Sequence, residues 1–241
     1  SKNNISEAHH NLGIIYLNGK YIKRDIQKAI HHFLLASNNN YSEAQLHLGY
    51  LYYDEKYIPR DIKKSIHYFS LAADQNDRRA QFALGTFYDL GKHVPQDINK
   101  AIRYYTLAAN QNHPFAQHSL GFIYETGRYV TRDIDKAIYY YKLASYQDHA
   151  ESQINLGFIY LEGKDVQQDI NKAIFYYKMA ANQNNLEAQY TLGHIYYDGK
   201  YIKRDVDKAI FYLQLAANQN DTNALYDLGI VYFHGKIIPR D

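Results

Sequence analysis

Apolar residues recur at helical spacing along the whole chain, in stripes that short polar segments separate. The first stripe lies in residues 6–18, where Ala8, Leu12 and Ile15 share one face of a helix. A second stripe begins at Ile26 and keeps the same three- and four-residue spacing to about residue 40. This alternation predicts pairs of short helices joined by tight connections.

The pattern repeats every 36 residues without an insertion or deletion, which identifies tandem duplication. A Leu-Gly dipeptide marks each copy and ends at Gly13, Gly49, Gly85, Gly121, Gly157, Gly193 and Gly229. One helical hairpin cannot bury its apolar face alone, so neighbouring copies must stack. We therefore predict an all-α fold, a right-handed superhelical α-solenoid of seven 36-residue helix-turn-helix units with the last incomplete. The expected units of this single domain, 1–241, are residues 7–42, 43–78, 79–114, 115–150, 151–186, 187–222 and the partial 223–241.

Recurring polar and small residues predict where the helices begin and end. Gly19 and its copies at 91, 127, 163, 199 and 235 suit a left-handed turn after the first helix, whereas Glu55 in the second unit would be strained there. Asp25 and its copies are expected to cap the second helix. Asn40 and its copies should end that helix in a left-handed turn.

Gly13 and its six copies lie inside the first helix, where glycine costs about 1 kcal/mol relative to alanine. Their repetition predicts that the two helices approach closely, with Ala29 and Ala36 of the second helix opposite.

The repeated motif A-x3-L-G-x-x-Y…G-x5-D-x-x-K-A-I-x-Y-Y-x-x-A-A resembles the SEL-one-like repeats, which are relatives of the tetratricopeptide repeats. The resemblance covers the whole chain. The chain departs from the family pattern at two places. Tyr21 and its equivalents stand where the family commonly carries a second glycine. Asn ends the second helix where the family often has Gly. The resemblance implies a non-catalytic adaptor that scaffolds protein complexes.

Positions that vary between units, on a helix that otherwise stays constant, are candidates for binding. They follow i, i+4, i+7 spacing, and in tetratricopeptide relatives the corresponding face lines a concave groove that holds peptides. The predicted partner-binding residues are Tyr50, Tyr53, Phe122, Phe158, Tyr190, Tyr197 and Phe233. The alternative is that some variable residues, especially Leu46, Phe82 and Ile154, only pack against the next unit.

Net charge is only +2, but most of the 27 lysines and arginines fall in residues 20–28 and the equivalent segments. One long edge is therefore expected to be basic, either as a solvated face or as a binding site for anions or nucleic acid. Its residues are Lys20, Arg24, Lys56, Arg60, Arg128, Arg132, Lys200 and Arg204. A protein or peptide partner is favoured over nucleic acid, and a spacer without any ligand is the third alternative.

Catalytic and metal-binding motifs are not found. Cysteine is absent, and no H-E-x-x-H, phosphate loop or nucleophile elbow occurs. His113 and His118 are interpreted as structural or surface residues. We predict no enzyme activity, no cofactor and no metal, because no unit differs chemically from the others.

The ends of the chain and its location give further expectations. Ser1 begins in an inter-unit loop and Asp241 falls at a helix cap, so we expect either a piece of a longer array or end-to-end self-association. No apolar run approaches the ~18 residues of a membrane span, and no secretory signal is visible. The compartment stays open.

Overall fold

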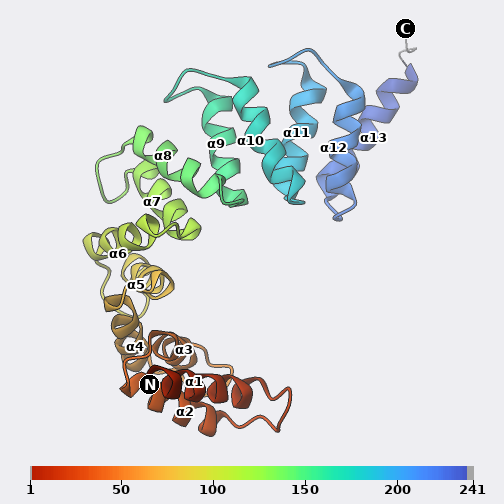
Figure 1. Ribbon diagram of the computed structural model, residues 1–241. Coiled ribbons are helices and arrows are strands. Elements are labelled where there is room, and N and C mark those ends of the chain that lie inside the picture. The colour runs from red at the N-terminus through yellow and green to blue at the C-terminus, as the bar shows by residue number, and fades with distance from the viewer. Residues whose placement is uncertain (1, 238–241) are drawn as a thin grey trace. The chain divides into compact units, whose positions relative to one another are not determined.

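The computed structural model describes residues 2–237, with side chains from residue 4 to 233, and this part of the chain forms thirteen α-helices and no strand (Figure 1). It divides into two compact units at Gln117 and His118. The N-terminal unit holds α1 (Lys2–Asn18), α2 (Ile26–Asn38), α3 (Ser42–Tyr53), α4 (Ile62–Asp74), α5 (Arg78–Leu90) and α6 (Ile98–Asn110). The division lies within α7 (Pro114–Thr126). The C-terminal unit continues with α8 (Ile134–Ser145), α9 (Ala150–Glu162), α10 (Ile170–Asn182), α11 (Leu186–Asp198), α12 (Val206–Ala217) and α13 (Thr222–Ile237).

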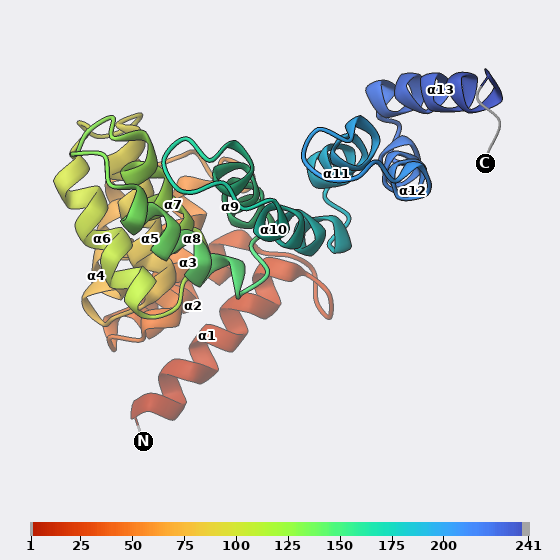
Figure 2. The same cartoon turned by 90° about the horizontal axis from the view of Figure 1, so that it is seen from above.

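Within each unit, consecutive helices pack against each other as hairpins, and neighbouring hairpins pack together. In the N-terminal unit α1 contacts α2, α3 contacts α4 and α5 contacts α6. In the C-terminal unit α12 contacts both α11 and α13 and lies between them in Figure 1, and Figure 2 shows α12 beside α11. This arrangement confirms the all-α solenoid that the 36-residue period predicts.

The predicted aspartate caps are confirmed in six repeats. In each, a carboxylate oxygen accepts a hydrogen bond from the backbone N–H three residues on, at 3.0 Å. The capping residues are Asp25, Asp61, Asp97, Asp133, Asp169 and Asp205. The lysine of the same turn forms an ion pair with each cap, at 2.7–3.8 Å. The seventh copy, Asp241, lies outside the described residues.

The predicted left-handed turns after the second helices are also confirmed, with φ between 58° and 64°. They occur at Asn40, Asn76, Asn112, Asn184 and Asn220, and at Asp148 in the fourth repeat. The glycines after the first helices are left-handed at 19, 91, 127, 163 and 199.

Two positions of that glycine series differ from the expectation. Helix α3 ends early at Tyr53, and its cap Asp54 has an extended backbone with φ −85°. Glu55 therefore avoids the strained left-handed conformation. Helix α13 continues through Gly235 to Ile237, so this glycine is helical and ends no helix.

Gly13 and its copies mark close helix approach, but their neighbours are rings and a leucine, where the sequence interpretation placed alanines. A Cβ at Gly13 would lie 2.5 Å from the ring of Phe33, and one at Gly49 would lie 2.6 Å from the ring of Phe69. The alanines are buried too, but the large side chain one turn on fills the space. The buried side chains that face glycine are Phe33, Phe69, Tyr105, Tyr141, Tyr177 and Leu213.

Candidate functional site

An apolar pocket of about 180 Å³ opens between α3 and α5 of the N-terminal unit. Tyr50 and Tyr53 of α3, both predicted partner-binding residues, form one wall. Phe82 and Thr86 of α5, the counterparts of Leu46 and Tyr50 one repeat later, form the other. The remaining lining comes from Phe69, Ala83, Phe87, Leu90, Lys92 and His93. The two tyrosines are therefore brought to one site, together with Phe82, which the alternative interpretation assigned to packing.

Helix packing within and between the repeats holds the aromatic walls of this pocket in place. Phe69 packs on Gly49 and forms the floor, 1% exposed. The ring of Tyr50 meets it edge-on at 5.0 Å between centroids, and Tyr53 meets Phe87 edge-on at 5.4 Å. Such edge-to-face contacts stabilise ring positions beyond simple burial. The walls are thus preorganised, while both tyrosines keep 40–46% of their surface exposed.

The polar groups around the pocket are largely satisfied by the protein itself. The Thr86 hydroxyl donates to the Phe82 carbonyl oxygen at 3.1 Å, so the methyl group is left for the pocket. Burial raises the pKa of Tyr50, which stays a neutral phenol. Lys92 supplies the one cation among the lining residues. This surface suits an apolar side chain better than an anion.

His113 supports the pocket from behind. Its ring stacks on Phe82 at 4.6 Å between centroids. Burial, with a smaller contribution from Arg78, lowers the pKa of His113 to about 4. A neutral imidazole therefore packs on the pocket wall at neutral pH.

The other predicted binding residues lie in the C-terminal unit. Phe122 on α7, Phe158 on α9 and Phe233 on α13 are more than half exposed. Tyr190 is half-buried and meets His194 edge-on at 4.6 Å, while burial and Asp227 raise its pKa to about 12.

Several residues of the predicted basic edge close helix ends. Arg60 and Arg132 donate through Nε to the carbonyl oxygens of Tyr53 and Glu125 at 2.8 Å. Gln96 and its equivalent Gln168 make the same bond from the same repeat position, at 2.6 and 2.7 Å. A neutral amide thus replaces the guanidinium, so the bond itself needs no positive charge. Arg24 reaches the Asn18 carbonyl oxygen at 3.3 Å.

The other cations of this edge lie over tyrosine rings or form ion pairs. Lys20, Lys56, Arg128 and Lys200 each lie 4.7–5.3 Å from the ring centroid of the following tyrosine. Arg204 lies 4.3 Å from the centroid of Tyr197. Arg132 pairs with Asp165, with Nη1 2.6 Å from Oδ1, and this bond lowers the pKa of Asp165.

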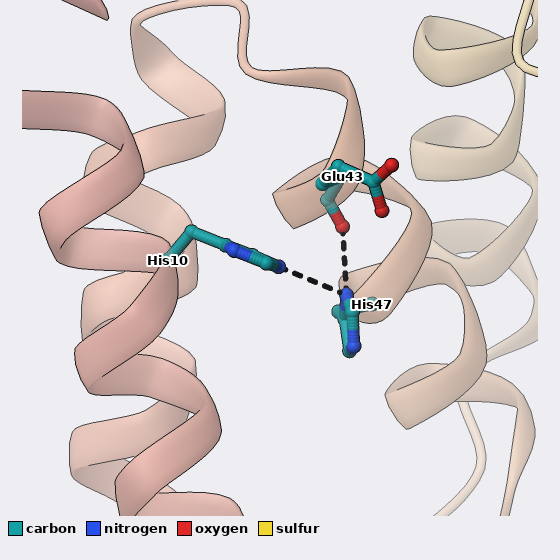
Figure 3. A group of neighbouring side chains, drawn as sticks. All are labelled: His10, Glu43 and His47. Atoms are coloured by element: carbon teal, nitrogen blue, oxygen red, sulfur yellow. Dashed lines mark hydrogen bonds between the residues drawn. The ribbon is translucent and has the colours of Figure 1, made fainter. Parts of the chain in front are cut away.

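Three side chains in the N-terminal unit, His10, Glu43 and His47, place ligand atoms within 4.8 Å of one another. His10 comes from α1 and the other two from α3, with His10 Nε2 3.3 Å from His47 Nδ1 (Figure 3). Residues 10 and 47 are 37 positions apart, so a search for ligands within one repeat misses them.

His118, the other histidine singled out from the sequence, is in the C-terminal unit. Its Nδ1 lies 3.0 Å from the Ser152 hydroxyl and its ring 4.7 Å from that of His149. Burial, with the charge of His149, lowers the pKa of His118 to about 4.

Buried glutamines form a further feature that the sequence interpretation missed. Gln45 donates to the Ser37 carbonyl oxygen of the preceding repeat at 3.5 Å and accepts from Gln75 of its own repeat at 2.6 Å. The same pair of bonds recurs at Gln81, Gln153 and Gln189. The invariance of this glutamine in five successive repeats is the signal that was available.

Comparison with known proteins agrees with this architecture. The model of the Sel1 repeat family matches residues 6–41, 42–77, 78–113, 114–149, 150–185, 186–221 and 222–241. The chain belongs to the Sel1 repeat family. Sel1 repeat proteins generally mediate protein–protein interactions and are generally non-catalytic scaffolds.

Solved structures show the same fold for this Sel1 repeat protein. It superposes with a TM-score of 0.84 and 27% identity on a protective antigen of uropathogenic Escherichia coli strains that displays an SLR fold. It superposes on a Sel1 repeat protein from Oxalobacter formigenes with a TM-score of 0.83 and 32% sequence identity. The superposition on the Escherichia coli antigen covers 95% of this chain and 49% of the antigen. The superposition on the Oxalobacter formigenes protein covers 94% of this chain and 65% of that protein. An immunity protein from Pseudomonas aeruginosa shares the fold at 0.55 and 19% identity, over 89% of this chain and 81% of the other.

Curated protein sequences contain no match to the chain. Within residues 2–237, no helix has both the length and the apolar character needed to cross a membrane.

Proposed function

We propose that this Sel1 repeat protein is a non-catalytic scaffold that holds an extended segment or a helix of another protein, with one large apolar side chain in the pocket between α3 and α5. The observation that carries the proposal is the pocket itself, since its walls come from variable positions of two successive repeats. The predicted residues Tyr50 and Tyr53 form the α3 wall.

The size and lining of the pocket support one aromatic or branched aliphatic side chain as its occupant. Its volume of about 180 Å³ slightly exceeds the roughly 150 Å³ of an apolar cavity that holds a benzene molecule. Rigid aromatic walls lower the entropic cost of binding, and aromatic side chains are enriched among binding hot spots. In the C-terminal unit, the exposed rings of Phe122, Phe158 and Phe233 are further candidates for partner contacts.

The basic edge is the second candidate site, for phosphates or nucleic acid. Its cations lie over tyrosine rings, hydrogen-bond helix ends or pair with acids, and neutral glutamine replaces arginine in two repeats. These contacts favour a structural role for the edge. A spacer that takes no ligand is the third candidate.

A peptide-display selection on the full chain tests the proposal. We expect the selected peptides to share one large apolar residue and to bind in fluorescence anisotropy. The Ala83→Leu variant fills the pocket and should weaken binding at least tenfold, as should Tyr53→Ala. The matched control is Thr191→Leu, at the same repeat position on α11, which should bind like the unmodified chain.

Other outcomes assign the function elsewhere. Equal binding by Ala83→Leu and the control would contradict the pocket. Acidic peptides whose affinity falls steeply between about 50 and 200 mM salt would move binding to the basic edge. Failure to select any peptide would favour the spacer.

A further inference from the structure

A cluster of potential metal ligands lies where the first repeat packs on the second, apart from the proposed peptide pocket. His10 points from α1 toward His47 on α3, and Glu43 lies one turn before His47 (Figure 3). His10 is buried, whereas His47 and Glu43 are half-buried. One side of the cluster is therefore open to a fourth ligand.

The spacing of the two ring nitrogens fits a shared cation. His10 Nε2 and His47 Nδ1 are 3.3 Å apart. Two histidine nitrogens at about 2.0–2.1 Å from a tetrahedral Zn²⁺ are separated by about 3.4 Å. The carboxylate of Glu43 contributes a third donor atom within 4.8 Å of both nitrogens.

The surroundings of Glu43 resemble an outer shell that orients a ligand. Arg79 Nη2 donates to Glu43 Oε1 at 2.7 Å and to Asp77 Oδ2 at 2.6 Å. This leaves Oε2 of Glu43 for another partner. Hydrogen bonds of this kind to a ligating carboxylate fix its orientation and strengthen metal binding.

Binding of a cation at this site requires no release of a proton from either histidine. In the metal-free chain, His47 Nδ1 lies 2.8 Å from the Glu43 carbonyl oxygen and donates to it. When a cation binds at Nδ1, that proton moves to Nε2 of the same ring, and both imidazoles stay neutral. The carbonyl oxygen loses one bond and lies close enough to the cation for an electrostatic interaction.

The same three repeat positions hold the full set nowhere else; the fourth and fifth repeats come nearest, with His118, Glu151 and Asn155. One repeat on they hold Leu46, Arg79 and Ala83, and in the fifth and sixth repeats Ile154, Glu187 and Thr191. A scaffold role for this set would be expected to recur, as the aspartate caps do. We propose that His10, Glu43 and His47 form a Zn²⁺ site with an open fourth position, a ligand set known from zinc sites that keep one place for water or another molecule.

The competing explanation is aromatic packing alone. His47 stacks on Phe33 at 5.2 Å with an interplanar angle of 16°, and His10 lies 5.3 Å from the ring of Tyr41. The two explanations differ in whether a metal binds, which isothermal titration calorimetry measures directly. We expect the tag-free full chain to bind one Zn²⁺ per molecule with micromolar or tighter affinity. Bound Co²⁺ should give the visible absorption that is typical of a low coordination number with nitrogen and oxygen ligands.

Conservative variants identify the ligands. His10→Gln, His47→Asn and Glu43→Gln keep polar groups in place but remove ligand atoms, and each should weaken Zn²⁺ binding at least tenfold. His47→Asn also keeps an N–H donor for the Glu43 carbonyl oxygen. The matched control is the His9→Gln, His32→Gln pair, because these histidines also approach each other, with their Nδ1 atoms 3.1 Å apart.

Imidazole NMR on the unmodified chain keeps the test decisive if a variant fails to fold. Zn²⁺ should shift the ring nitrogen signals of His10 and His47 first. Three results would overturn the site: no saturable binding, unchanged affinity in folded ligand variants, or loss of binding only in the His9 and His32 control.

Discussion

Two junctions between repeats, α3 with α5 and α9 with α11, share one backbone frame and differ at their variable surface. In both, a glycine of the first helix packs on a buried ring, Gly49 on Phe69 and Gly157 on Tyr177. In the first junction Tyr53 is 40% exposed beside a pocket, whereas its counterpart Leu161 in the second is 9% exposed and belongs to the core.

The residue after the interhelix turn differs as well. His93 lines the pocket of the first junction, whereas its counterpart Tyr201 packs against the core cluster of the second. The comparison shows that the same glycine–ring contact packs the two helices of a hairpin together at both junctions. The variable positions then decide whether the space between neighbouring repeats is filled or left for a ligand.

The largest effect is expected from adding a methyl group to the shared frame. Gly49→Ala places Cβ 2.6 Å from the ring of Phe69, and Gly157→Ala places it 2.9 Å from that of Tyr177. Overpacking of this kind costs about 1–3 kcal/mol. Urea unfolding should show a loss for both, larger for Gly49→Ala.

Gly229→Ala is the matched control for these variants. No described atom lies within 4 Å of the added Cβ, so helix propensity alone should stabilise α13 by up to about 1 kcal/mol. An equal loss of stability in all three glycine variants would contradict the prediction that the glycine–ring contacts determine the effect.

Acidification should affect both compact units through a half-buried histidine in each. The folded pKa of His113 and His118 is about 4, below the ordinary value of 6.5, so the unfolded chain binds more protons between these values. Stability is fully present above pH 6.5 and should fall as the pH drops toward 4. Melting temperatures of His113→Gln and His118→Gln should depend less on pH in this window, and an unchanged dependence in both would rule out these groups as its source.

A smaller acid effect is expected from the exposed caps. Backbone hydrogen bonds lower the pKa of Asp97 and Asp169, so their contribution is present above the ordinary value near 3.8 and is lost as the pH falls through the folded value. Asn also caps helices but does not titrate. Circular dichroism at pH 7 and pH 3 should show that Asp97→Asn reduces this loss, whereas Asp97→Ala should destabilise the helix even at pH 7.

The smallest effect is expected from Arg60→Gln. Glutamine makes the same bond to the preceding helix in the third and fifth repeats, so the free energy of unfolding should change by less than about 0.5 kcal/mol. Arg60→Gln loses a long, exposed ion pair with Glu55, whereas Arg132→Gln loses the closer ion pair with Asp165 and should be slightly less stable in chemical denaturation. A large loss in Arg60→Gln would show that the charge itself holds the turn.

The sequence was sufficient for the repeat frame because each of its rules is local. Asp25 caps and Asn40 turns within a few residues of their own position, and the 36-residue period transfers these rules to every copy. The helix pairs and their order followed from the same period.

Contacts between repeats were less accessible. The pair His10 and His47 and the pocket wall at Phe82 depend on which side chains meet across a junction, and Phe33 opposite Gly13 raises the same question within one hairpin. Hydrophobic periodicity assigns a face but does not choose the partner on it. Tyr50 and Tyr53 could be nominated because they vary, whereas their pocket required coordinates.

The buried glutamines have a consequence for how the array grows. Gln81 joins the Ala73 carbonyl oxygen of one repeat to Gln111 at the end of its own, and Gln153 and Gln189 make the same connection. Each internal repeat therefore presents the same acceptor at its end and the same bridging amide at its start. A 36-residue cassette can be copied or excised between two such repeats without stranding a buried polar group, so gene duplication can change the reach of the scaffold in discrete steps.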